Sequence, residues 1–464
     1  MRIFGHYIRR RVLMLAAAEL LVAYLCLYLV LTLPPFQPEV LSLLDPELVA
    51  ATLVVLLVLT LAGLYESDYL ATRSTLRSLL RLVPALLFVG GLLLLYGALV
   101  PAALFSPTAV GGGVLLLLTG LVAERTLWCN FSDADAFKRR ILVLGTGSRA
   151  RAIETVHPDK APDDLPFRVL GYIATEGEKD CPQDPARQLQ LGCDASLLEM
   201  ARDFRAHEIV VAIRDRRGNL PVRQLLECKL NGVAVTDVSS FFEREQQRVQ
   251  LDSLNASWLI FGEGFRQHWT RNAIKRTFDV LASSTLLLAT LPVMLVTALA
   301  IKLESRGPVF YWQTRVGLGN VPFEVCKFRS MREDAEVDGV ARWAVRDDDR
   351  ITRVGRIIRK LRIDELPQVI NVFQGSMSFV GPRPERPVFV EQLTEQIPYF
   401  PARHTIRPGI TGWAQVRYPY GASVEDARQK LQYDLYYVKN HTLFLDILVL
   451  FETVKVVLFG RGAR

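Results

Sequence analysis

The chain carries two adjacent carboxylates, Asp364 and Glu365, directly after a segment rich in basic side chains. The basic residues of this segment are Arg353, Arg356, Arg359, Lys360 and Arg362. Arg356 and Arg359 share one face of a helix because they are three positions apart, and so do Arg359 and Arg362. The spacing therefore gathers several guanidinium groups close to two carboxylates.

Two interpretations of this segment follow from the residue types. In the first, a solvated basic helix precedes a second helix that has Asp364 as its N-cap and Pro367 in its first turn. In the second, the helix N-terminus and the guanidinium groups bind an anion. Neighbouring positive charges keep a carboxylate there ionised. An ionised carboxylate facing a bound diphosphate can attack phosphorus.

A second acidic motif is Asp347-Asp348-Asp349. It could hold a metal ion as the DxD motif of nucleotide-sugar glycosyltransferases does. A membrane glycosyltransferase with Asp347 and Asp349 on the metal is thus the alternative enzyme, and it would release UDP. An acidic loop in solvent between Arg346 and Arg350 is the commoner explanation of such a motif.

Several other chemistries lack their residues. None of the 14 tyrosines has a lysine four positions later, which excludes the proton-transfer pair of short-chain epimerases, and the absence of a Gly-Lys pair excludes a P-loop. The six histidines form no HxxxH pair and the six cysteines form no CxxC pair. A zinc site and histidine-based acid–base chemistry are therefore disfavoured, and the carboxylates are the better candidates.

A glycine-rich turn, Gly145-Thr-Gly147-Ser-Arg-Ala150, follows a predicted strand, where backbone N–H groups can approach a phosphate. A tight strand-to-helix turn without a ligand explains it at least as well, because no acidic residue stands at a clear strand end about 20 positions on. If only this turn binds a ligand, the chain is a non-catalytic nucleotide-sensing membrane module.

Composition divides the chain between lipid and water. Of its 464 residues, 50% are hydrophobic and 22% are charged, and the mean hydropathy is +0.21. This is too apolar for an ordinary soluble enzyme and too charged for a chain that is membrane-embedded throughout, and it excludes intrinsic disorder. The net charge of +7 fits anionic lipid or a phosphorylated substrate better than nucleic acid.

Residues 1–126 are predicted to form four transmembrane helices. The apolar runs are Val12–Leu33, which contains Glu19, and Leu48–Tyr65, Leu82–Leu104 and Thr108–Val122. Each is near the roughly 20 residues that cross the hydrocarbon core. A cleaved signal peptide is the competing interpretation of the first run. Basic residues occur only in alternate loops, which places the N-terminus and everything after Arg125 in the cytoplasm.

Residues 139–262 show the pattern of a Rossmann-like α/β domain. Short apolar runs alternate with polar, helix-like stretches, which is typical of a mostly parallel sheet. The predicted strands are Ile141–Leu144, Phe167–Ile173, Ile209–Ile213, Val233–Val238 and Trp258–Phe261.

The third region, residues 273–464, is predicted to be α-rich and opens with the apolar run Val280–Leu303. Basic residues flank this run on both sides, which favours a return to the same face of the membrane. Pro292 lies near the midpoint and lacks the N–H that a straight helix needs. We therefore predict a re-entrant helix over residues 280–303 that breaks at Pro292. A later run, His441–Phe459, is expected along the membrane surface with its apolar face in lipid and Asp446, Glu452 and Lys455 towards water, a buried core helix being the alternative.

Six blocks in this region resemble, in order, the bacterial polyprenyl-phosphate sugar-1-phosphate transferases, which are monotopic phosphoglycosyl transferases. They are Lys275-Arg276-x-x-Asp279, Gln313-x-Arg315-x-Gly317, Lys327-Phe-Arg329-Ser-Met, Asp364-Glu365-Leu-Pro-Gln, Val380-Gly-Pro-Arg383-Pro and Arg407-Pro-Gly-Ile-Thr-Gly-Trp. With the preceding regions, the chain looks like the large form of the family, especially the subgroup associated with PEP-CTERM exopolysaccharide loci. Two positions depart from the family pattern: Ser376 replaces a usual aspartate, and Arg362 replaces a small residue.

The resemblance implies transfer of a hexose-1-phosphate from a UDP-sugar to undecaprenyl phosphate, with release of UMP, as the first membrane step of exopolysaccharide synthesis. Asp364 would be the nucleophile and Glu365 a metal-associated carboxylate or general base, and both would meet Mg²⁺. Phosphate oxygens would be held by Arg359 and Arg383, with Lys327, Arg329 and Arg407 as further candidates. The implied location is the bacterial inner membrane, with the catalytic domain on the cytoplasmic face and in contact with lipid. Nucleic acid is not an implied partner, and a homodimer is compatible with the family.

Overall fold

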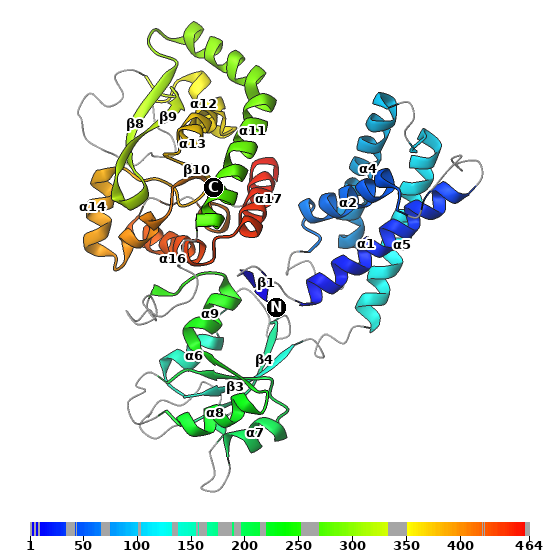
Figure 1. The fold of residues 1–464 in the computed structure, drawn as a ribbon, viewed down its shortest axis with the longest axis vertical. Coiled ribbons are helices and arrows are strands. Elements are labelled where there is room, and N and C mark those ends of the chain that lie inside the picture. Colours follow the sequence, from blue (N-terminus) through cyan, green and yellow to red (C-terminus); the bar gives the residue numbers. More distant parts are fainter. Residues whose placement is uncertain are drawn as a thin grey trace. The chain divides into compact units, whose positions relative to one another are not determined.

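The computed structural model forms two compact units, Ile8–Val238 and Ser239–Arg464, the second including Arg2–Tyr7 (Figure 1). The structure describes residues 2–3, 6–7, 10–33, 42, 44–65, 75–100, 104–131, 138–154, 156, 165–174, 188–189, 196–213, 220–251, 269–332, 350–419, 421 and 423–459. The acidic motif Asp347–Asp349 and the predicted strand Trp258–Phe261 lie outside these residues.

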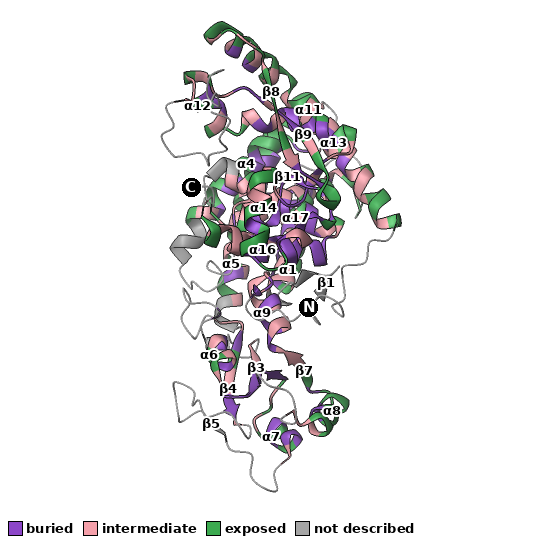
Figure 2. Ribbon diagram, turned by 90° about the vertical axis from the view of Figure 1, so that its left-hand side faces the viewer, coloured by how far each residue is buried: buried purple, intermediate pink, exposed green. Residues whose placement is uncertain are grey.

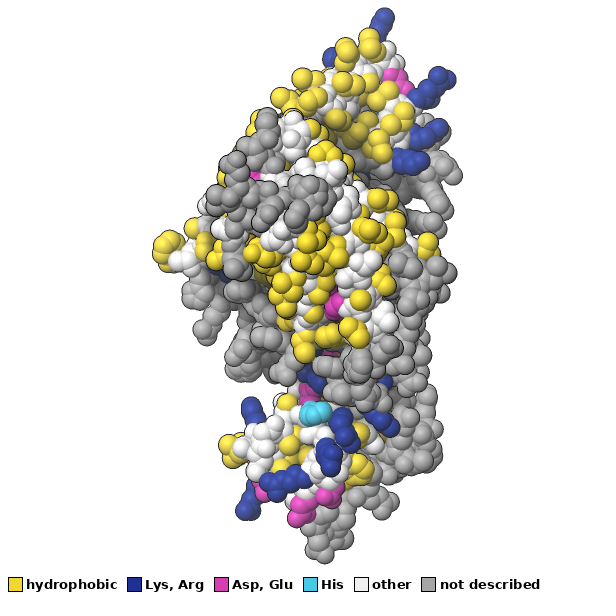
Figure 3. All heavy atoms as spheres, turned by 90° about the vertical axis from the view of Figure 1, so that its right-hand side faces the viewer, with side chains coloured by type: hydrophobic (Ala, Val, Ile, Leu, Met, Phe, Trp, Pro, Cys, Tyr) yellow, Lys and Arg dark blue, Asp and Glu magenta, His cyan; other side chains and the backbone are white. Residues whose placement is uncertain are grey.

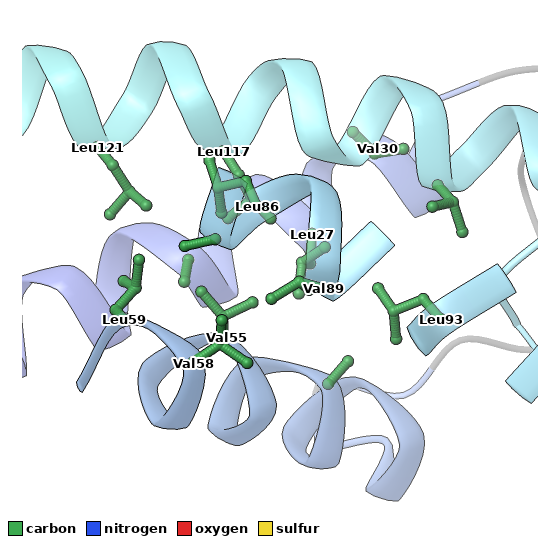
Figure 4. Packing of buried hydrophobic residues seen from close by; sticks show 14 of the residues in the cluster. Leu27, Val30, Val55, Val58, Leu59, Leu86, Val89, Leu93, Leu117 and Leu121 are labelled. Atoms are coloured by element: carbon green, nitrogen blue, oxygen red, sulfur yellow. The ribbon is translucent and has the colours of Figure 1, made fainter. Parts of the chain in front are cut away.

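Four helices of the first unit pack around one apolar core. They are α1 (Arg10–Thr32), α2 (Pro46–Leu61), α4 (Thr75–Leu99) and α5 (Pro107–Phe131). Figure 4 shows Leu27 of α1, Val55 of α2, Val89 of α4 and Leu117 of α5 within this core, where all four are buried. The apolar runs of the sequence therefore pack against one another on one face and leave many hydrophobic side chains exposed on the other.

Three of these helices contain segments long and apolar enough to cross a membrane, namely Val12–Thr32, Leu80–Leu99 and Pro107–Trp128. The second predicted span, Leu48–Tyr65, is shorter than expected, because α2 ends at Leu61 after 16 residues. At 1.5 Å per residue it is about 24 Å long, against a hydrocarbon core of about 30 Å. Gly63, with a φ of +75°, follows the end of this helix.

Glu19, the charged residue of the first apolar run, is fully buried in the bundle. Nε of Arg125 in α5 donates to its Oε1 at 2.6 Å, and the hydroxyl of Tyr65 donates to its Oε2. A charge inside an apolar bundle is tolerated only with such partners, because an isolated one is expensive at low dielectric. The ion pair thus joins α1 to α5.

The remainder of the first unit contains a five-stranded, all-parallel sheet in the order β5-β4-β3-β6-β7. The strands are β3 (Arg139–Leu144), β4 (Phe167–Ile173), β5 (Gln188–Leu189), β6 (Glu208–Val211) and β7 (Ala234–Asp237). The helices are α6 (Ser148–Glu154), α7 (Leu197–Asp203) and α8 (Val222–Leu230). Four strands match predicted runs, whereas β5 was not predicted because two residues form no apolar pattern. Doubly wound sheets have this strand order.

The second unit is α-rich. Its longer helices are α9 (Val238–Gln246), α11 (Trp269–Glu304), α12 (Arg353–Lys360), α14 (Pro387–Gln396), α16 (Val424–Asn440) and α17 (Leu443–Phe459). Short helices are α13 (Val369–Gln374), α15 (Trp413–Arg417) and the 3-10 helices η4 (Leu318–Asn320), η5 (Ile363–Gln368) and η6 (Phe400–Thr405). Strands pair as β1 (Arg2–Ile3) with β2 (His6–Tyr7), β8 (Phe310–Val316) with β9 (Pro322–Phe328), and β10 (Ser378–Val380) with β11 (Gly409–Thr411).

Helix α11 is a single helix of 36 residues that contains Pro292. The predicted break in the helix at this proline is therefore not found, since the backbone stays helical on both sides of it. Figure 1 shows instead that α11 changes direction along its length, as a proline inside a helix commonly causes. Its buried residues are Asp279, Ser283, Thr297 and Ile301. Most of α11 is exposed or half-exposed in Figure 2, and hydrophobic side chains cover its surface at the top of Figure 3.

Residues 239–251, which the sequence assigned to the α/β domain, make their contacts in the second unit. Glu243 of α9 forms a buried ion pair with Lys439 at 2.7 Å and accepts from Nδ2 of Asn440 at 3.0 Å. The indole N–H of Trp413 donates to the carbonyl of Gln247 at 2.9 Å. The boundary between the two units thus lies near Val238, before the predicted one.

The predicted surface position of Asp446 in α17 is wrong, because this side chain is only 1% exposed. Its carboxylate accepts from the hydroxyl of Tyr437 and forms an ion pair with Lys275 at 3.0 Å. On this side, α17 is a core helix, with Leu445 and Val449 also fully buried.

Candidate active site

Asp364 and Glu365 lie in a tight connection between two helices. Thr352 is the N-cap of helix α12, and its hydroxyl accepts from the Gly355 N–H at 2.9 Å. The helix ends before Arg362, which has a left-handed backbone with a φ of +59°. The chain then forms η5, which contains both carboxylates. Asp364 is therefore not the N-cap that our first interpretation made it; Arg362 holds that position in η5.

Glu365 is surrounded by cations. Its Oε1 lies 3.2 Å from Nζ of Lys327, 3.0 Å from Nη2 of Arg383 and 3.9 Å from Nη1 of Arg362. Burial by itself raises the pKa of Glu365, but the positive charges of Arg383, Lys327 and Arg362 outweigh burial and hold this pKa well below its ordinary value. Glu365 is therefore ionised and held in one position.

Asp364 has the opposite surroundings. Its Oδ1 is buried and has no hydrogen-bond partner in the part of the chain that the structure describes. Burial raises the pKa of Asp364, and the negative charge of Glu365 raises it further, while Lys327, Arg359 and Arg362 offset these effects only in part. The cations lower the pKa of Asp364, as the basic neighbours in the sequence predicted, but burial and Glu365 outweigh them, so that the cations favour ionisation of Glu365 over that of Asp364. A buried carboxylate oxygen without a hydrogen-bond partner can bind a metal ion or form a bond to phosphorus.

Two distant segments bring Lys327 and Arg383 to η5. Lys327 belongs to β9 in the β8–β9 hairpin, and Arg383 follows β10 in a loop. A Cβ on Gly409 would lie 2.0 Å from the backbone nitrogen of Gly381, so only glycine permits the pairing of β10 with β11 at this point. The glycines of these two sequence blocks therefore place the loop that carries Arg383.

The remaining predicted phosphate-binding residues have separate surroundings. Arg359 lies close enough to Asp364 to lower its pKa. Arg329 is buried, and its guanidinium donates to the carbonyls of Ser305 and Arg306 at 3.2 and 2.7 Å, just after the C-terminus of α11. Nε of Arg407 donates to the carbonyl of Gly375 at 2.9 Å, at the end of α13. Arg329 and Arg407 thus bind helix ends, and a phosphate-binding role for them stays a prediction.

A small pocket beside Glu365 is lined by a basic side chain to which the sequence assigned no role. Arg315 lines it together with Lys327, Arg383 and Gln368. Nη1 of Arg315 donates to the carbonyl of Pro384 at 3.2 Å, in the same loop as Arg383. The sequence did contain a signal for this side chain, because Arg315 is the basic residue of the block Gln313-x-Arg315-x-Gly317.

Ser376 occupies the position of the usual aspartate at the end of α13. Its hydroxyl donates to the carbonyl of Asn371 at 3.1 Å. Nδ2 of Asn371 in turn donates to the carbonyl of Glu324, and its Oδ1 accepts from the N–H of Cys326 at 2.9 Å. In this chain the position therefore closes a turn against β9.

The first sequence block, Lys275-Arg276-x-x-Asp279, fixes α11 to the rest of the second unit. Lys275 forms an ion pair with Asp279 at 2.8 Å. Asp279 accepts from the Ser378 hydroxyl at 2.9 Å and from the Phe379 N–H at 3.1 Å, both in β10. Arg276 donates to the last carbonyls of α13. The exposed apolar helix is thus fixed to the strand that leads to Arg383.

The fold and the site together define a membrane-associated protein. Its pair of carboxylates is surrounded by lysine and arginine side chains, which are the types that commonly bind phosphate. A family model described as bacterial sugar transferase matches residues 270–460. The chain is 46% identical over 242 residues to an Aeromonas hydrophila UDP-N-acetylgalactosamine-undecaprenyl-phosphate N-acetylgalactosaminephosphotransferase, which covers 52% of this chain and 56% of that protein. The match therefore spans a little over half the length of this relative.

Two further relatives extend the comparison. A Xanthomonas campestris UDP-glucose:undecaprenyl-phosphate glucose-1-phosphate transferase is 31% identical over 356 residues, or 75% of this chain and 73% of that protein. An exopolysaccharide production protein of Rhizobium leguminosarum is 44% identical over 190 residues, or 39% of this chain and 93% of that protein. The chain belongs to the family of bacterial polyprenyl-phosphate sugar-1-phosphate transferases.

Proposed function

We propose that the chain transfers a hexose-1-phosphate from a UDP-sugar to undecaprenyl phosphate and releases UMP, through a covalent intermediate on Asp364. The observation that supports this proposal is the contrast within the carboxylate pair. Glu365 is held by Lys327 and Arg383, whereas Oδ1 of Asp364 is buried without a partner among the described residues. A nucleophile needs a free oxygen next to cations that bind its electrophile.

The reaction takes two displacements. First, a carboxylate oxygen of Asp364 bonds to the β-phosphorus of the UDP-sugar, and the bond from this phosphorus to the bridging oxygen breaks, so that UMP leaves. Second, an oxygen of undecaprenyl phosphate bonds to the same phosphorus, and the bond to Asp364 breaks. The carboxylate is restored and the lipid carries a diphosphate-linked sugar.

The residues of the cluster have distinct tasks in this scheme. Lys327 and Arg383 flank the pocket and would hold phosphate oxygens of the donor, since a guanidinium can bind a phosphate with two parallel hydrogen bonds. Arg359 acts from the α12 side, where its charge already reaches Asp364. Glu365 keeps the positive side chains in place between turnovers.

Asp364 also fits a magnesium ion. The described ranges contain no group of three His, Cys, Asp or Glu side chains that could hold a metal by themselves. Mg²⁺ is usually bound through one or two carboxylates together with substrate phosphates and water. The carboxylate of Asp364, whose Oδ1 has no hydrogen-bond partner among the described residues, has two oxygens, so one could bind the ion and the other attack phosphorus. Glu365 is the second candidate, although Lys327 and Arg383 already contact its Oε1. When bound, the ion would neutralise the diphosphate.

We further infer that α11 enters the inner membrane from the cytoplasmic face and returns to it. Exposed side chains such as Leu288, Leu295 and Leu303, at 74%, 63% and 78%, suit contact with lipid. This keeps the site next to cytoplasmic UDP-sugars and to the phosphate of the lipid carrier.

We assign the parallel sheet as a Rossmann-like module on the basis of its strand order. Helix α6, which follows the glycine-rich turn, has only seven residues and therefore contributes little to the binding of a phosphate.

The decisive experiment supplies the full chain, in detergent or lipid, with Mg²⁺, undecaprenyl phosphate and a panel of UDP-sugars. We expect UMP release with at least one sugar, beginning with the UDP-glucose and UDP-N-acetylgalactosamine named for the relatives, and loss of release with a chelator. Release of UDP would instead support the DxD glycosyltransferase. Nucleotide binding without turnover would support the sensing module.

A further inference from the structure

Arg403, in η6, is a buried cation outside the carboxylate cluster. Its side chain is 5% exposed, and its Nη2 lies 2.7 Å from Oδ2 of Asp434 in α16, which is 2% exposed. The guanidinium also lies over the ring of Phe400, 5.2 Å from the ring centroid. Moving two charges out of water is costly, so a buried pair of this kind calls for a structural or functional reason.

The same nitrogen of Arg403 donates a hydrogen bond to the backbone carbonyl of Arg383 at 2.9 Å. Arg383 lies in the loop between β10 and α14, where Pro382 and Pro384 supply no N–H for hydrogen bonding. The neighbouring carbonyls of Pro382, Pro384 and Glu385 accept from the Gly409 N–H, from Arg315 and from the Val316 N–H, and the carbonyl of Arg383 itself accepts from Arg403. The backbone of Arg383 is thus held by Arg403, while its side chain reaches Glu365 at 3.0 Å.

We propose that Arg403 and Asp434 are positioning residues that act on the reaction through Arg383. Asp434 fixes the guanidinium of Arg403, Arg403 fixes the Arg383 carbonyl, and the Arg383 side chain is thereby aimed at Glu365 and the donor phosphate. The kinetic part of this inference rests on the proposed function. The structural part concerns the loop alone.

The structural part is tested by hydrogen–deuterium exchange of the full chain in detergent. Arg403→Lys keeps the charge but cannot reproduce the planar fork of arginine, and Asp434→Asn keeps the size of its partner. We expect either variant to raise exchange at the amides of Arg383 and Glu385. Glu243→Gln is the control, because it removes the charge of another buried ion pair, in which Glu243 of α9 contacts Lys439 of α16, the helix that also carries Asp434, without touching the loop. Unchanged exchange in the loop for both variants, or an equal rise in the control, overturns the proposal.

The kinetic part is a double-mutant cycle with Arg383→Ala, measured as UMP release. We expect Arg403→Lys to lower kcat/KM about tenfold, as for a lost hydrogen bond to a charged group. In the Arg383→Ala background the same change should cost less than about twofold, because its effect passes through the missing side chain. Equal effects in both backgrounds overturn the proposal. A wild-type chain that releases no UMP from any sugar contradicts the proposed function instead, and the exchange experiment then decides the positioning role.

Discussion

Asp364 and Glu365 are neighbours in the chain, and their carboxylates have opposite surroundings. Lys327 and Arg383 lie 3.2 and 3.0 Å from the same oxygen of Glu365, whereas Oδ1 of Asp364 is buried without a hydrogen bond in the described structure. Their pKa values accordingly move in opposite directions, down for Glu365 and up for Asp364. Two titratable groups separated in this way commonly have different chemical roles.

The first prediction concerns the nucleophile. Asp364→Asn keeps the size of the side chain and removes the attacking charge, so turnover should fall by about a thousandfold or more. Labelled phosphosugar should also no longer be trapped on the protein. Measurement of UMP release and of trapped label checks both effects. If the asparagine variant keeps more than a few per cent of activity, with deamidation excluded, Asp364 is not the nucleophile.

The second prediction is that the two carboxylates have opposite effects on stability. The pKa of Asp364 is raised by folding, so its ionised form lowers stability above that pKa and ceases to do so once the pH falls below its unfolded value. Asp364→Asn should therefore raise the melting temperature at pH 8 by a few degrees, since about 1 kcal/mol corresponds to about 2–4 °C in a unit of this size. The gain should shrink as the medium is acidified.

Glu365→Gln is the matched comparison. The pKa of Glu365 is lowered by folding, so its contribution to stability is present above the unfolded pKa and is lost as the pH falls through the folded one. At pH 8 this variant should melt at a lower temperature, because Lys327 and Arg383 lose their counter-charge. Thermal unfolding at several pH values measures both variants, and a shift of the same sign for the two would contradict the assigned surroundings.

The third prediction separates two arginines of one helix. Arg359 lowers the pKa of Asp364, whereas Arg356 is exposed. Arg359→Gln should raise KM for the UDP-sugar about tenfold, as expected for the loss of a charged contact to phosphate. Arg356→Gln removes the same charge from α12 and should change KM less than about twofold. Equal changes in steady-state kinetics would show that only the net charge of α12 matters.

The fourth prediction concerns the extent of the second unit. A truncated protein that begins at Ser239 retains the contacts of Glu243 with Lys439 and of Gln247 with Trp413, and one that begins at Arg271 does not. Both should release UMP, but the longer one should melt several degrees higher. Calorimetry in detergent measures the difference. Complete inactivity of the longer protein, if well folded, would show that the first unit contributes to the active site.

The fifth prediction concerns the path of α11 in the membrane. Trp269 and Arg306 are exposed at its two ends, whereas Ser305 is held by Arg329 and is less suitable for labelling. In a background without the native cysteines, Trp269→Cys and Arg306→Cys should both resist a membrane-impermeant maleimide in intact spheroplasts and react after lysis. Labelling of Arg306→Cys alone before lysis would show that α11 crosses the membrane.

Local sequence patterns were sufficient to identify the kinds of element and the segment that carries the chemistry. Apolar runs and turn residues predicted the helices of the bundle and four strands of the parallel sheet, because these patterns are local. The same local reading placed Asp364 and Glu365 beside a basic helix, and the resemblance added Lys327 and Arg383 to them. The apolar pattern alone misplaced the end of α2 and the boundary near Val238, where Gly63 follows the helix and α9 packs in the second unit.

The distribution of the cations between Glu365 and Asp364 could not be predicted from local patterns, because it depends on how remote segments pack. Lys327 and Arg383 come from a hairpin and a loop far from η5 in the chain, and both form ion pairs with Glu365. Likewise, Arg329 and Asp446 looked available in the sequence but are buried and bonded in the fold. Electrostatic energy depends on distances and burial, and these are fixed only when segments remote in sequence pack together.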